Sequence, residues 1–185
     1  MIPVLIALLI LSCAPVYRAE KGCPSTEDLM RVYATKRTPK EFRIYGRVSY
    51  GPVKVPFFMA KFDGIYTVKV PRREIKLEDG KVCLENRCYL LPFPPENLVF
   101  GGVLEGGERE LCEGGVKILS EKRGVYERVI LFEGKRLAEV RIRNLKNGKV
   151  IRVIFGRRDP RGYFREIGVR TEGAWFKLLI EEVEI

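Results

Sequence analysis

The chain has 185 residues, carries a formal charge of +10 and contains no histidine. Without histidine neither a Ser-His nor a Cys-His pair can form, so the common nucleophilic hydrolases are excluded and we expect no enzyme. Only a pair of carboxylates stays open as a catalytic arrangement. Glutamine is also missing while lysine, arginine and glutamate abound, which is typical of thermophile proteins.

The first residues predict a lipoprotein signal. The apolar run 2–11 is shorter than the roughly 20 residues that a helix needs to cross a bilayer, but it fits the apolar region of a secretory signal. The sequence ILSC over 10–13 fits the bacterial lipobox, in which the cysteine becomes the acylated N-terminus. A plain cleaved signal ending near Ala19 and a cytosolic protein with an apolar N-terminus are the alternatives.

This signal divides the chain into three parts. We predict a lipoprotein signal peptide over 1–12, a tether over 13–22 that begins with the acylated Cys13, and one domain over 23–185. Roughly 170 residues can bury one core but are too few for two comfortable domains.

A short amphipathic helix is predicted where the domain begins. In PSTEDLMRVYATKR, Ser25 or Thr26 can cap the helix and acidic residues follow in its first turn. Leu29, Met30 and Tyr33 then recur at helical spacing. About three turns are therefore expected.

After Pro39 the apolar pattern changes to period two. FRIYGRVSYG places Phe42, Ile44 and Val48 on one side and charged residues on the other, which is typical of a strand buried on one face. VKVPFFMAKFDG, IYTVKVP and REIKLEDGKVCLENRCYLL continue the strands through tight turns. A meander of antiparallel strands is predicted.

A short helical insertion interrupts this meander. PFPPENLVFGGVLEGG has prolines suited to a first helical turn and an apolar side, and six further strands are predicted after Val116. The ten or eleven strands form one wide sheet, which two helices cannot cover if it is flat. We therefore predict a mainly β fold: a strongly curved antiparallel sheet forming an unclosed half-barrel, with both helices over its concave face.

Four cysteines besides Cys13 predict two disulfides in an exported chain. In KVCLENRCYL a two-residue hairpin places Cys83 opposite Cys88 as a non-hydrogen-bonded pair, whose Cα separation of roughly 4.5 Å suits a disulfide. Cys23 then pairs with Cys112. No metal site is expected, because the C-x4-C spacing without histidine does not fit zinc.

Positive charge is concentrated in the segment 115–165, which holds fifteen lysines or arginines against five acids. An exported chain without a stacking motif is not expected to bind nucleic acid. Solvated strand faces, an acidic partner and anionic lipid headgroups remain as explanations.

Three local segments and the order of the predicted elements point to a known family. The segments are FRIYGRVSY, PFPPENLVFGGVLEG and the closing GYFREIGVRTEGAWFKLLIEEVEI. From about Leu29 to Ile185 the chain resembles the LolA/LolB superfamily. These proteins are the periplasmic carrier and the outer-membrane receptor of bacterial lipoproteins. The resemblance implies an apolar cavity for acyl chains of lipoproteins or lipids, a periplasmic carrier protein as partner, and no cofactor. A lipidated member resembles the receptor, which implies a lipid anchor on the periplasmic face of the outer membrane.

Aromatic and aliphatic positions of the predicted strands and insertion are the candidates for lining that cavity. They are Phe42, Ile44, Phe58, Tyr66, Val68, Val70, Leu98, Leu104, Leu131, Val140, Ile142, Ile154, Trp175 and Phe176.

The resemblance also implies a protruding loop that helps to push cargo into the membrane. The comparable turn, VPRREIK, carries Arg72 and Arg73 at its tip, which favour anionic headgroups over hydrocarbon. The alternative function is a non-enzymatic scaffold lipoprotein that docks an acidic partner on its basic face. An open apolar cleft favours the carrier, and a close-packed interior favours the scaffold.

Acylation is testable on natively expressed, detergent-extracted protein. We expect intact mass spectrometry to show residues 13–185 with two or three acyl chains on Cys13, because the lipobox directs cleavage before that residue. An unmodified chain, or one cleaved near Ala19, would contradict the prediction.

Overall fold

A computed structural model of the chain describes residues 22–71, 73–78, 81–84, 87–90 and 93–185. The predicted signal peptide, Cys13 and Arg72 lie outside the described residues, as does the side chain of Arg73. None of the described helices combines the length and the apolar composition needed to cross a bilayer.

Thirteen strands form one antiparallel sheet in the described part of the chain, in the order β6-β5-β4-β3-β2-β1-β13-β12-β11-β10-β9-β8-β7. Their bounds are β1 Phe42–Tyr50, β2 Val53–Phe62, β3 Ile65–Val70, β4 Arg73–Glu78, β5 Lys81–Leu84, β6 Arg87–Leu90, β7 Arg109–Glu113, β8 Val116–Arg123, β9 Tyr126–Glu133, β10 Arg136–Asn144, β11 Val150–Phe155, β12 Glu166–Arg170 and β13 Trp175–Glu184.

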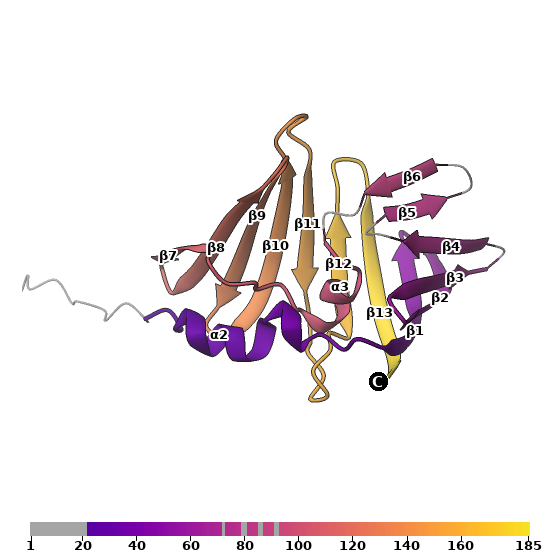
Figure 1. Cartoon of the computed structure of the whole chain (residues 1–185), viewed down its shortest axis with the longest axis horizontal. Helices are drawn as coiled ribbons and strands as arrows, with labels where there is room; N and C mark the ends of the chain where they lie inside the picture. Colours follow the sequence, from indigo (N-terminus) through magenta and orange to yellow (C-terminus); the bar gives the residue numbers. More distant parts are fainter. Residues whose placement is uncertain (1–21, 72, 79–80, 85–86, 91–92) are drawn as a thin grey trace, which may run out of the picture.

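Every neighbouring pair in this sheet is consecutive in the chain except β1 and β13, and the edge strands β6 and β7 do not pair with each other. In Figure 1, β3 to β6 run across the view while β8 to β13 run up and down, so the sheet curls through a large angle. The predicted unclosed, mainly β half-barrel is confirmed. The strand number is higher than the predicted ten or eleven, and β7 was missed because all its residues are exposed and show no alternation of burial.

Two α-helices lie in the described ranges, and capping residues mark where they begin or end. Helix α2 (Thr26–Tyr33) begins after Ser25, whose side chain accepts a hydrogen bond from the backbone N–H of Asp28 at 3.1 Å, and it is followed by a 3-10 turn at Thr35–Arg37. Helix α3 (Glu96–Phe100) ends at Gly101, which adopts φ 69°.

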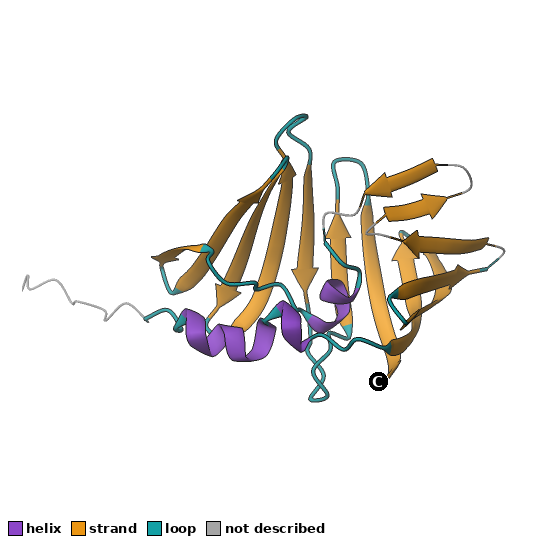
Figure 2. Cartoon of the chain, in the orientation of Figure 1, coloured by secondary structure: helices purple, strands orange, loops and turns teal. Residues whose placement is uncertain are grey.

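Both helices lie over the lower half of one face of the sheet (Figure 2), which we call the inner face. Burial alternates along β1 and β9, so that one side of each strand packs under the helices and the other meets solvent. The resulting core joins helices, loops and strands: Leu29, Tyr33, Phe42, Ile44, Val99, Phe100, Leu104, Ile130, Phe132, Leu137, Phe155, Phe164 and Ile167.

The predicted pairing of Cys23 with Cys112 is confirmed, with 6.0 Å between their Cα atoms. This disulfide joins the segment before α2 to the edge strand β7. Cys83 lies directly opposite Cys88 in the backbone register, as predicted, but the side chains of that pair lie outside the described residues.

Removing both Cys23 and Cys112 by alanine substitution is expected to lower the free energy of unfolding by about 4 kcal/mol, since the bond closes a long loop in the unfolded chain. Urea denaturation measures the loss, and Cys112→Ala alone should give nearly the same value. A loss below about 1 kcal/mol would contradict this role.

Candidate functional site

Most of the predicted cavity residues lie on the inner face or in the segments that cover it. The strand register and burial divide them into two groups. Phe42, Ile44, Leu104, Val140 and Ile142 are buried, whereas Tyr66, Val68, Val70, Leu98 and Phe176 are half-buried.

Four predicted cavity residues point to the opposite, outer face. Phe58 pairs with Tyr45, Leu131 lies between the buried Ile130 and Phe132, and Ile154 is 37% exposed. Trp175 is 45% exposed and lies over Gly168, where an added Cβ would meet its ring at 2.4 Å. Because neighbouring residues of a strand face opposite ways, these four side chains do not lie on the concave side.

A buried polar contact fixes α3 to the inner face. Glu96, the first residue of α3, is 6% exposed and accepts hydrogen bonds from Lys61 Nζ at 2.6 Å and Tyr66 Oη at 2.5 Å. Lys61 belongs to β2 and Tyr66 to β3, so the carboxylate joins two strands to one helix. The sequence signal was available but missed: Lys61 occupies an inner position of its strand, between apolar neighbours.

This contact shifts two pKa values. Burial, together with the hydrogen bond to Glu96, raises the pKa of Tyr66 to about 12. Burial alone would lower the pKa of Lys61, but its hydrogen bonds with Glu96 and Tyr66 outweigh that effect and raise it. Both groups therefore keep their protons at neutral pH.

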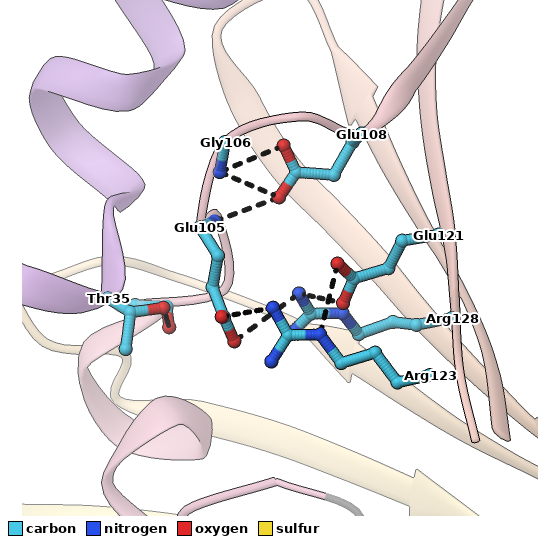
Figure 3. Close-up of polar contacts among 8 residues, drawn as sticks. Thr35, Glu105, Gly106, Glu108, Glu121, Arg123 and Arg128 are labelled. Atoms are coloured by element: carbon cyan, nitrogen blue, oxygen red, sulfur yellow. Dashed lines mark hydrogen bonds and ion pairs between the residues drawn. The ribbon is translucent and has the colours of Figure 1, made fainter. Parts of the chain in front are cut away.

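A second polar cluster holds the segment after α3 (Figure 3). Glu108 accepts hydrogen bonds from the backbone N–H groups of Glu105 and Gly106, which shapes the loop. Arg128 Nη2 lies 2.5 Å from Glu121 on the neighbouring strand, and Arg123 pairs with Glu105 and Glu121. Breaking such a partly buried network leaves charges without partners, so it keeps the loop on the sheet.

The space directly under α3 is nearly filled. A cavity of about 10 Å³ lies between α3 and the strands, lined by Asn97, Leu98, Arg128 and apolar neighbours. A cavity of that size holds about one water molecule. This cavity therefore has no room for an acyl chain.

An open cleft lies at the other end of the inner face, where no described helix covers the strands (Figure 2). Its volume is about 610 Å³, and Tyr126, Ile142 and Ile151 form its apolar wall. The turns 144–149 and 171–173 border it with polar groups. Drug-sized and lipid-like ligands occupy clefts of this size and character.

Half-buried apolar side chains extend this surface across the sheet. Val55, Val48 and Leu178 lie side by side in register, and Val169 pairs with Phe176. Each is partly open to solvent because the helices end short of it. We call this surface, together with the cleft, the open half of the inner face.

No group of histidine, cysteine or acidic residues within the described ranges is arranged to hold a metal ion. The clustered carboxylates pair with arginine or lysine. The cleft combines an apolar wall with polar border groups that include Lys149 and Glu172, so the arrangement supports binding of an amphiphile.

The curled, one-sided sheet with two helices over its inner face defines a fold of the LolA/LolB kind. The crystal structure of LolA superfamily protein NE2245 from Nitrosomonas europaea superposes with a TM-score of 0.55, covering 88% of this chain and 94% of that chain at 10% sequence identity. In sequence, no protein-family model and no curated protein matches the chain. The LolA-like fold predicted from the sequence is thus confirmed by structure.

The Glu96 contact gives a pH test. Because the pKa of Tyr66 is about 12 in the folded chain and about 10 when unfolded, the unfolded state loses the proton first and stability falls as pH rises from 10 towards 12. The raised pKa of Lys61 acts in the same direction.

We expect Tyr66→Phe to reduce this alkaline loss, measured by urea denaturation at about pH 9 and pH 11.5. The control is Tyr50→Phe, at a tyrosine that is 52% exposed, and it should keep the wild-type slope. Equal slopes in wild type and Tyr66→Phe would contradict the assignment.

Proposed function

We propose that the protein is a lipid-anchored carrier that binds acyl chains of lipoproteins or lipids on the open half of its inner face and takes part in their localisation to the outer membrane. The cleft of about 610 Å³ with its apolar wall carries the proposal. The LolA-like fold supports it, since the solved structure with this fold is titled a LolA superfamily protein.

The physical driving force is burial of methylene groups. Each methylene removed from water contributes about 0.8 kcal/mol, and the half-buried side chains of the open half lose solvent at the same time. Asn144, Asn147 and Lys149 at the cleft border can bind the polar end of an amphiphile while its chain follows the strands. An amphiphile with one acyl chain suits this arrangement.

A tether on Cys13 would keep the domain close to the membrane. Nine residues separate Cys13 from Cys23, and a fully extended chain of that length spans about 30 Å. Cys23 would therefore stay within about 30 Å of the bilayer surface. We place the anchor on the periplasmic face of the outer membrane, with a periplasmic carrier protein as donor of the cargo.

One observation favours the second candidate function, a scaffold that docks an acidic partner. Arg141, Arg152 and Arg170 lie side by side in register on the outer face, next to Trp175. Among the described residues, Glu139 alone pairs with this row, through Arg141 at 2.7 Å and Arg152 at 2.6 Å. Arginine and tryptophan are enriched among the residues that contribute most to binding energy in protein interfaces.

Two isoleucines of β11 provide a matched test. Ile151 lines the cleft, whereas Ile154, three residues along the same strand, lies on the outer face. Ile151→Glu places a charge in the path of the acyl chain and is expected to weaken binding of a fluorescent fatty acid at least tenfold. Ile154→Glu should change the affinity less than twofold, measured by fluorescence titration.

Equal affinities of the two variants, or no binding by the wild type, would contradict the carrier. If Ile154→Glu instead abolished localisation of lipoproteins to the outer membrane in the cell while acyl binding persisted, the scaffold function would explain the protein better.

A further inference from the structure

A second cleft lies at the opposite end of the molecule. Its volume is about 370 Å³, and four arginines line it: Arg31, Arg37, Arg158 and Arg161. We call it the arginine cleft. The end of α2, the turn 158–162 and the last residue all lie at the lower edge of Figure 1, whereas the turns that border the open half lie at the upper edge. The two clefts are therefore separate.

Two aromatic rings and a backbone carbonyl hold the side chain of Arg158 in place. Its guanidinium lies over the ring of Tyr33 at 5.0 Å and over that of Phe164 at 5.9 Å, and Nη2 donates to the carbonyl oxygen of Gly162 at 3.2 Å. Its Nε is buried without a hydrogen-bond partner among the described residues. The guanidinium is thus fixed by aromatic rings and has no carboxylate partner in the described part.

Arg161 is oriented by a carboxylate beneath the cleft. Its Nε lies 3.2 Å from Asp159 Oδ1 and its Nη2 lies 2.5 Å from Tyr163 Oη. The backbone N–H of Arg161, followed by the side chains of Arg165 and Arg161, holds the pKa of Asp159 well below its usual range. One carboxylate therefore serves two arginines, and positive charge remains in excess.

The ion pairs of Arg31 and the lack of any for Arg37 among the described residues also leave positive charge in excess. Arg31 pairs with Glu27 at 3.3 Å and Asp28 at 3.8 Å, both on its own helix. Arg37 makes no ion pair with any described residue, and no acidic side chain lines the cleft. An anion entering it would meet Arg37 and Arg158 together, and the α-carboxylate of Ile185, which also lines the cleft, offsets their charge only in part.

We propose that the arginine cleft binds a phosphate ester. The planar guanidinium matches the spacing of phosphate oxygens and forms paired, charge-assisted hydrogen bonds with them. The volume of about 370 Å³ exceeds what a bare phosphate needs, and Val32, Pro39 and Phe100 supply an apolar wall for the group that the phosphate carries. A phospholipid headgroup and a soluble phosphate ester share this chemistry.

Isothermal titration of the full chain tests the proposal with four soluble probes: dihexanoyl phosphatidate, glycerol 3-phosphate, inorganic phosphate and dihexanoyl phosphatidylcholine. Arg37→Gln is the main variant, since Arg37 is exposed and no side-chain contact of it is described. Arg158→Lys keeps the positive charge but removes the planar guanidinium that can form paired hydrogen bonds. Lys36→Gln removes the same charge one residue away, outside the cleft lining.

We expect saturable binding of at least one phosphate monoester, weakened about tenfold or more by Arg37→Gln and by Arg158→Lys and less than twofold by Lys36→Gln. Tighter binding of dihexanoyl phosphatidate than of glycerol 3-phosphate assigns the site to a lipid headgroup, and equal binding assigns it to a soluble ester. Absence of saturable binding, or equal weakening by Arg37→Gln and Lys36→Gln, would overturn the proposal.

These outcomes are distinguishable from failure of the carrier function. If a lipid probe binds through its acyl chain in the open half, Arg37→Gln does not change the affinity of that probe. Ile151→Glu should leave binding of glycerol 3-phosphate intact, because Ile151 lines the other cleft and not the arginine cleft.

Discussion

A single antiparallel sheet has two faces, and two short helices cover one of them in the part of the chain that the structure describes. The Glu96 carboxylate is the contact on which that cover depends, because it holds α3 to β2 and β3 through Lys61 and Tyr66. Removing these groups from water costs free energy, and their hydrogen bonds offset that cost only when the groups are correctly placed. The contact therefore specifies where the helix lies.

The position of α3 sets the character of the rest of the inner face. Beneath the helix the side chains are buried, and the cavity between α3 and the strands has a volume of about 10 Å³. Beyond it Val48, Val169 and Leu178 are only half-buried, and the strands open into the larger cleft. A ligand can gain from apolar burial there without disturbing the core. Stability and binding are thus assigned to different halves of one surface.

The sequence predicted the strands because segments such as FRIYGRVSY alternate, and it predicted the curvature because two helices cannot cover a flat sheet of that size. It predicted Cys23–Cys112, since the hairpin register left no other partner for either cysteine. It could not assign faces in β2, β9 and β11, where apolar residues follow one another without alternation, and Phe58, Leu131 and Ile154 were therefore placed on the wrong face. In such runs the packing partners decide the face, and these come from distant parts of the chain.

The polar contacts were harder still to predict. Glu96 was expected only as a first-turn acid, and nothing local shows that it meets Lys61 and Tyr66. The arginine cleft is assembled from α2, the turn after it and the turn 158–162, which are distant in sequence. A charge count showed the excess of arginine but not where it gathers.

The central claim is that an acyl chain lies on the open half of the inner face. Paramagnetic broadening in methyl-labelled protein by a doxyl-labelled stearic acid tests it directly. The account predicts broadening of the methyl signals of Ile151, Val169 and Leu178, with those of Leu131 and Ile154 unaffected. Broadening confined to outer-face methyls, or none at saturating probe, would contradict it.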